Sequence, residues 1–153
     1  MLIASLFVTV LAFSTIASSP TIGWIGDKVS KQKLSSVCML CGATSLLILI
    51  NQNGNLWLLT AFCVLMALAE SSNPLSWAIM GDCFGRKNFA TLRGWQNVPD
   101  QLMSMSTPVW MGFIYDNTSS YYWALVPLSG MYVAAAVLFW TIPKPTIPTR
   151  LRD

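Results

Sequence analysis

The sequence predicts an all-α polytopic membrane protein. Hydrophobic residues make up 54% of the 153 residues and charged residues only 10%, whereas soluble domains carry about 25% charged residues. The apolar residues gather in runs long enough to cross a bilayer, and the cations lie in short segments between the runs. A nucleic-acid-binding protein would instead gather its cations on one soluble patch. We therefore expect the lipid bilayer as a partner and no nucleic acid.

Five apolar runs are expected to be transmembrane helices within a membrane domain of residues 1–143. Their approximate bounds are 2–26, 34–50, 56–80, 94–115 and 122–142. Residues 144–153 are rich in proline and basic side chains, and we expect a disordered cytoplasmic tail there. The first run could alternatively be interpreted as a secretory signal peptide. No Lys or Arg precedes Lys28, so the positive segment that opens a signal peptide is missing, and a retained span is favoured.

Alternating five spans across a bilayer places every Lys and Arg on one side. These cations are Lys28, Lys31 and Lys33 after the first span, Arg86, Lys87 and Arg93 after the third, and Lys144, Arg150 and Arg152 in the tail. Because cations favour the cytoplasmic side, we expect the N-terminus outside and the C-terminus in the cytoplasm. The protein would be a multi-pass protein of the plasma (inner) membrane.

Glu70 is the acidic residue predicted to lie deepest in the membrane. It would sit well inside the third span, where an ionised side chain facing lipid costs at least about 2 to 3 kcal/mol, so it should face a bundle interior, a cavity or a partner. Asn73 and Trp77 share its helix face. Pro74 cannot donate to the carbonyl of Glu70, which predicts a kink there. These side chains are candidates for a substrate or proton pathway, and a carboxyl that only holds helices together is the alternative.

The fourth span carries a polar stripe. Asn97, Gln101 and Ser104 share a face, with Asp100 beside it. Pro108 predicts a break in this helix, and the helix could begin as late as Pro99. A discontinuous pathway helix would show such a pattern, but so would a well-packed kinked helix. Small hydroxyl residues of the first span, such as Ser18, likewise suit either helix packing or a pathway.

The polar segment between the first two spans contains Gly23, Gly26 and Asp27. The two glycines share a helix face and let another backbone approach closely. Asp27 stands at the C-terminal end of a helix, where the macrodipole disfavours a carboxylate, so it implies a cation or a second helix end nearby. The segment resembles the signature loop of the major facilitator superfamily of secondary transporters, roughly Gly-x-x-x-Asp-Arg/Lys-x-Gly-Arg/Lys-Arg/Lys. The residues that fit are Gly23, Asp27, Lys28, Lys31 and Lys33, whereas Ser30 and Gln32 depart from the pattern.

Two later segments resemble bacterial members of that superfamily, especially those akin to oxalate/formate and monocarboxylate carriers. Residues 84–91, Phe-Gly-Arg-Lys-Asn-Phe-Ala-Thr, are similar to their loop between the tenth and eleventh helices. Residues 112–121 are similar to the Gly-x-Ile-Tyr-Asp-x-Thr-Gly-Ser-Tyr pattern that closes the eleventh helix, with Ser119 in place of the usual Gly.

The resemblance implies that the five spans are helices eight to twelve of a twelve-helix carrier and form most of its C-terminal six-helix bundle. The N-terminal helices of the same carrier would then be missing partners. In the family, substrate passes between two halves that open alternately to each side. By resemblance Asp27 would tie helix ends together as a gate, with Arg86 and Arg93 as candidate partners.

The composition offers little for enzymatic, metal or cofactor chemistry. The chain has no His, the commonest general base. Its CxxC, Cys38 and Cys41, lies in an apolar run without a second pair, and a thiol there stays protonated. We expect no catalytic residue, no metal and no cofactor. The first functional hypothesis is part of a carrier for a small solute, such as an organic anion, with or without a coupling ion. The alternative is a small non-transporting membrane protein that binds or scaffolds other helices.

Overall fold

The structure, a computed structural model, describes residues 2–51, 54–84 and 89–142, with side chains from Ser5 onward. These residues form α1 (Leu2–Lys28), α2 (Lys31–Ile50), α3 (Leu56–Glu70), α4 (Asn73–Phe84), α5 (Phe89–Thr118) and α6 (Tyr122–Thr141). The described part of the chain contains no β-strand. The predicted tail and the candidate gate partner Arg86 lie outside the described residues.

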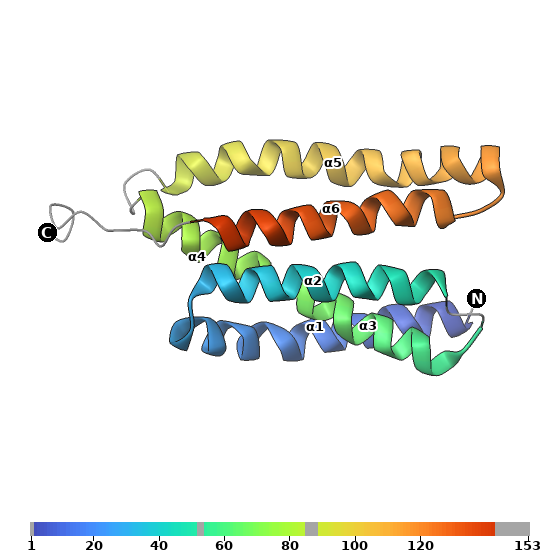
Figure 1. The fold of residues 1–153 in the computed structure, drawn as a ribbon, viewed down its shortest axis with the longest axis horizontal. Helices are drawn as coiled ribbons and strands as arrows, with labels where there is room; N and C mark the ends of the chain where they lie inside the picture. The colour runs from blue at the N-terminus through green and yellow to red at the C-terminus, as the bar shows by residue number, and fades with distance from the viewer. Residues whose placement is uncertain (1, 52–53, 85–88, 143–153) are drawn as a thin grey trace, which may run out of the picture.

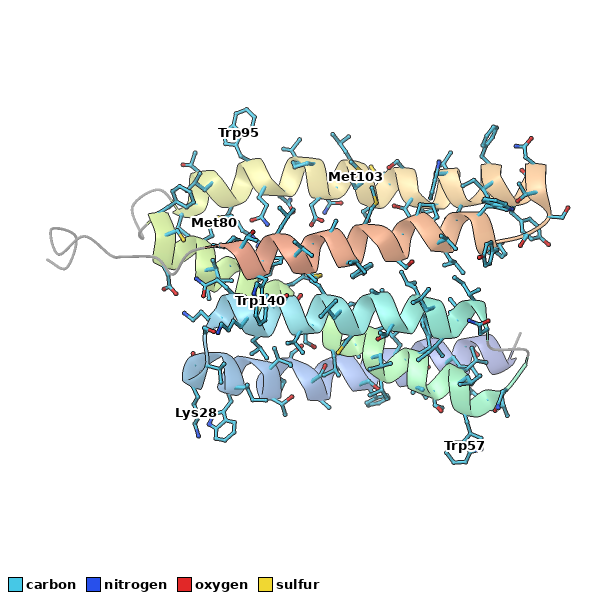
Figure 2. The ribbon with its side chains drawn as sticks, in the orientation of Figure 1. Lys28, Trp57, Met80, Trp95, Met103 and Trp140 are labelled. Carbon is cyan, nitrogen blue, oxygen red and sulfur yellow. The ribbon has the colours of Figure 1, made fainter. Side chains whose placement is uncertain are left out.

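The helices run up and down along one long axis (Figure 1). α1 and α6 end at the same end of the bundle where α2 and α5 begin, and we call this the basic end. The basic end carries the described cations Lys28, Lys31, Lys33 and Arg93. Lys28 lies there, whereas Trp57 lies toward the opposite end (Figure 2). The bundle thus keeps the charge segregation that the sequence predicts.

Four stretches are long and apolar enough to cross a membrane: Ser5–Lys28, Lys31–Ile50, Leu56–Phe84 and Tyr122–Thr141. Many of their large side chains are exposed in the bundle, as Trp57 is at 84%, and lipid contact accounts for this exposure. Within the described residues, α5 is outside this group although it has 30 residues. Its polar stripe lowers the hydropathy, so the fifth crossing stays a prediction.

The predicted kink at Pro74 is present as a short break between α3 and α4. α3 ends at Glu70, and α4 starts again at Asn73. Pro74 has no N–H that could donate to the Glu70 carbonyl. Backbone and hydroxyl groups of Ser71 and Ser72 close the turn between the two helices. Ser71 N–H donates to the Ala67 carbonyl at 3.0 Å, and Ser72 N–H donates to the Ala69 carbonyl at 3.1 Å.

The predicted break at Pro108 was wrong, because α5 is one helix that contains both Pro99 and Pro108. It also begins at Phe89, before either of the starts that the sequence offered. Each proline removes one backbone hydrogen bond. The two prolines stand about two and a half turns apart, so intact turns separate the two losses and the helix continues.

The centre of the bundle is α2, which packs closely on α3 and α6. A Cβ added at Gly42 would lie 2.7 Å from the Tyr132 ring of α6 and 2.9 Å from the Ala69 Cβ of α3. The buried Ser36 hydroxyl donates to the Ala136 carbonyl of α6 at 2.7 Å. Small residues in the contact surface permit this close approach, as expected between membrane helices.

A second apolar contact joins α1, α2 and α4. Ile22, Cys38 and Leu75 form a buried cluster, with Leu34 and Leu68 packed against it. Gly26 lies beside the same cluster, since a Cβ there would come within 3.2 Å of Leu75. These contacts fix α4 on the bundle.

We expect Gly42→Ala to destabilise the protein, because the added methyl group would overlap a ring and a neighbouring Cβ. Overpacking of this kind costs about 1 to 3 kcal/mol. Thermal stability in detergent or nanodiscs measures the effect. Gly130→Ala is the matched control, since a Cβ there meets nothing within 4 Å. Equal melting temperatures for the two variants would contradict the assigned α2 contact.

Candidate functional site: a polar cleft between α4 and α5

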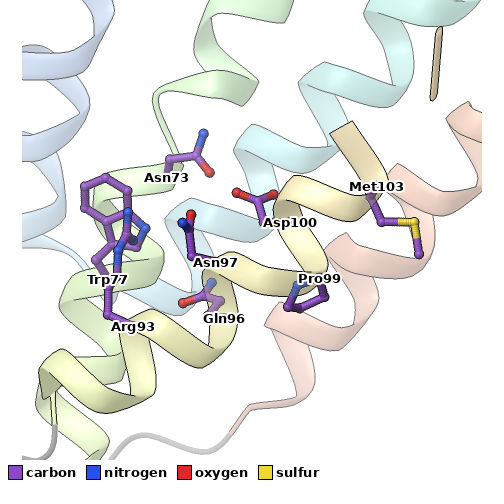
Figure 3. A pocket seen from close by; sticks show the side chains of 8 residues that line it. All are labelled: Asn73, Trp77, Arg93, Gln96, Asn97, Pro99, Asp100 and Met103. Carbon is purple, nitrogen blue, oxygen red and sulfur yellow. The ribbon is translucent and has the colours of Figure 1, made fainter. Parts of the chain in front are cut away.

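A cleft of about 530 Å³ separates α4 from α5. Its lining residues are Asn73 and Trp77 from α4, and Arg93, Gln96, Asn97, Pro99, Asp100 and Met103 from α5. Figure 3 shows these side chains, with Asn97 and Asp100 on the side of α5 that faces Asn73 and Arg93 beside Trp77. Apart from Pro99, the α5 residues are linked by spacings of three or four positions, which places them on one helix face.

Polar side chains of the cleft are unusual in their hydrogen bonding. Elsewhere, many side chains bond back to their own helix; Asn51 donates to the Leu47 carbonyl and Asn117 to the Phe113 carbonyl. Within the described parts of the chain, the five polar or charged side chains of the cleft have no hydrogen-bond or ion-pair partner. They are Asn73, Arg93, Gln96, Asn97 and Asp100. Their donors and acceptors are therefore available to a bound molecule or water.

Arg93 is oriented by an aromatic ring. Its guanidinium carbon lies 3.3 Å from the centre of the Trp77 ring, a cation–π contact. A guanidinium that stacks through its face keeps the N–H donors at its edge free. The pair thus presents a fixed cationic edge at the end of the cleft near the start of α5.

Four of the predicted pathway residues, Asn73, Trp77, Asn97 and Asp100, line this cleft. Glu70, Gln101 and Ser104 are exposed side chains outside its lining. The structure adds Arg93, Gln96, Pro99 and Met103. Helical spacing from Asn97 and Asp100 could have found Arg93, Gln96 and Met103, but the sequence interpretation followed the face of Gln101 and Ser104.

Glu70 belongs to a separate polar contact between α1 and the end of α3. The Thr15 hydroxyl lies 3.3 Å from Glu70 Oε2 and 2.9 Å from the Leu11 carbonyl. One turn further along α1, the Ser18 and Ser71 hydroxyls are 2.5 Å apart. Polar side chains of α1 therefore contact the chain where α3 breaks.

The signature-loop segment joins α1 to α2 at the basic end. Lys31 Nζ forms an ion pair with Asp82 Oδ2 of α4 at 2.7 Å. Asp27 is exposed and has no ion pair within the described residues, so its gate role stays a prediction. The sequence interpretation assigned Asp82 no role. Asp82 stands near the C-terminal end of α4, so the helix-dipole argument made for Asp27 would have predicted a cationic partner for it.

Two other lysines of the loop rest on tryptophans. Lys28 Nζ lies 3.6 Å from the centre of the Trp24 ring, and Lys33 Nζ lies 5.5 Å from that of Trp140. Gly23, unlike Gly26, has nothing within 4 Å of an added Cβ. The loop thus contacts α4 through Lys31 and α6 through Lys33.

Comparison with known proteins decides the family. The model of the Major Facilitator Superfamily matches residues 2–152. The chain belongs to the major facilitator superfamily. No curated protein and no solved structure gave a match. This superfamily consists of transporters that lie in the bilayer and bind small molecules, so this member is an integral multi-pass membrane protein of transporter type.

In this superfamily member, the cysteines Cys38 and Cys41 are free thiols. No group of three or more His, Cys, Asp or Glu side chains that could hold a metal ion occurs in the described segments. The chemistry available in the described site is therefore that of hydrogen bonds, one cation and one carboxylate.

We expect the Lys31–Asp82 ion pair to contribute modestly to stability, because its side chains are 28% and 40% exposed. Exposed pairs are worth about 0.2 to 1 kcal/mol. A double-mutant cycle with Lys31→Met and Asp82→Asn, followed by thermal unfolding, measures the coupling. The same cycle with Lys28→Met in place of Lys31→Met should show none. Additive effects of Lys31→Met and Asp82→Asn would contradict the pairing.

Proposed function

We propose that this chain is the C-terminal part of a secondary active carrier that moves a small organic anion by alternating access. The polar cleft between α4 and α5 carries the proposal, because it collects hydrogen-bonding groups that have no protein partner among the described residues. Concave sites with a few convergent polar groups are typical of small-molecule binding.

An organic anion is favoured by two observations. The segments 84–91 and 112–121 resemble those of oxalate/formate and monocarboxylate carriers. Arg93 also offers a cationic edge to the cleft, and a guanidinium matches the geometry of a carboxylate.

Alternating access requires contacts that break and re-form at one end of the carrier. The basic end has such contacts in the Lys31–Asp82 ion pair and the stacking of Lys33 on Trp140. By the charge rule the basic end faces the cytoplasm, with the N-terminus outside, in the plasma membrane. The remaining seven helices of a twelve-helix carrier would complete the pathway.

Glu70 is proposed as the site where a coupling ion, such as a proton, acts on the cycle. It is the last residue of α3, at the helix break, and it contacts α1 through Thr15. A change of charge at this position would alter the contact between α1 and α3, since an ionised carboxylate accepts hydrogen bonds only, whereas its protonated form also donates.

We expect Glu70→Gln to abolish coupled uptake by the full-length carrier while membrane expression is retained. Uptake of radiolabelled carboxylates into proteoliposomes, with and without a proton gradient, is the measurement. Asp116→Asn, near the end of α5 and outside the cleft, is the control and should transport normally. Loss of expression in Glu70→Gln would identify the carboxyl as structural, and unchanged coupling would contradict the proposal.

Asp27→Asn should change the balance between outward- and inward-open states and leave substrate affinity unchanged, because Asp27 lies outside the cleft. Accessibility of single cysteines introduced at each end of the carrier measures that balance. A Lys28→Gln variant tests whether any charge change in the loop has the same effect. Unchanged accessibility at both ends would argue against the gate.

A further inference from the structure

The cleft between α4 and α5 carries one charge of each sign. Arg93 and Asp100 both line it and stand on the same face of α5, seven positions apart. At about 1.5 Å per residue, that is about 10 Å along the helix axis. Gln96 and Asn97 lie between them, and Asn73 lies on the α4 side with Asp100 across the gap (Figure 3).

The two charges do not neutralise each other. Asp82 is held by Lys31 at 2.7 Å, but neither Arg93 nor Asp100 has an ion pair in the part of the chain that the structure describes. Arg93 is kept on the Trp77 ring instead. A molecule that lies along the cleft therefore meets a cation at one end, amides in the middle and a carboxylate at the other end.

The positions of the two charges restrict the ligand to a narrower class than organic anions in general. A carboxylate suits the free guanidinium edge of Arg93. A second anionic group at the far end would face Asp100, and like charges brought together oppose binding. A hydrogen-bond donor at that end, either an ammonium or a hydroxyl group, would instead pair with the Asp100 carboxylate.

We propose that the cleft selects a small carboxylate whose far end bears hydrogen-bond donors, and that Asp100 rejects dicarboxylates long enough to bring a second carboxylate against it. This inference rests on the proposed function, because it names the substrate class of the same cleft. Arg93 binds the carboxylate end, Gln96 and Asn97 bond polar groups along the molecule, and Asp100 determines specificity at the far end.

The test uses ligands that share a four-carbon chain and differ at one end. The full-length carrier is placed in nanodiscs, and its affinity for butyrate, succinate, γ-aminobutyrate and γ-hydroxybutyrate is measured by ligand-induced thermal stabilisation. We expect succinate to bind at least about tenfold more weakly than the better of the two donor-bearing ligands, because of its repulsion from Asp100. Comparison of the amino and hydroxy compounds shows which donor is preferred.

Two variants locate the discrimination. Asp100→Asn should remove most of the disadvantage of succinate, because the amide carries no charge and offers donors. Arg93→Gln should weaken all carboxylates together, by about tenfold or more. Asp116→Asn, the other carboxylate described on α5, should leave the order of affinities unchanged.

Succinate binding as tightly as the donor-bearing ligands would overturn the inference, as would an order of affinities that Asp100→Asn leaves intact. No stabilisation by any of the four compounds would also overturn it. If the protein transports solutes but does not show this order of affinities, only the inference on substrate class is contradicted. If it shows this order of affinities but moves no solute across a vesicle membrane, only the proposed function is contradicted.

Discussion

The close contact of α2 with α3 and α6 is the constraint on which the arrangement of the other helices depends. Gly42 lets the Tyr132 ring and Ala69 approach the α2 backbone more closely than a side chain at position 42 would permit. The hydrophobic effect contributes little to the association of membrane helices, so van der Waals contact over small residues stabilises their packing. With α3 fixed, the break between α3 and α4 directs α4 toward α5. The wall of the cleft that α4 supplies thus depends on packing at the centre of the bundle.

The polar side chains of the bundle fall into two groups: some form hydrogen bonds within the protein, and others lack protein partners among the described residues. Ser18, Ser71 and Thr15 bond to carbonyls or to one another across α1 and α3, so their hydroxyls stabilise the site of the helix break. The cleft side chains between α4 and α5 lack such partners in the described structure. Lipid cannot supply hydrogen bonds, so such groups belong where water or a solute reaches them. This difference separates residues that hold helices together from those that we propose to line a pathway.

The charges of the basic end are likewise divided between contacts. Lys31 joins the loop after α1 to α4, and Lys33 joins it to α6. Both contacts are partly exposed and individually weak. Weak contacts between helix ends would suit the proposed alternating access, since a ligand shifts a conformational equilibrium only by its differential binding to the two states.

The sequence by itself determined the class, most helix positions, the break at Pro74 and the gathering of cations at one end. These features follow from hydropathy, proline chemistry and charge, which are local properties. Four residues of the cleft could also be grouped from the sequence, because helical spacing fixes a face. Tertiary structure decided which face of α5 meets α4, that Arg93 stacks on Trp77, and that Lys31 rather than Arg93 pairs with a carboxylate among the described residues. It also decided that α5 continues through Pro108. Such outcomes depend on how whole helices rotate against each other, and no short segment contains that information.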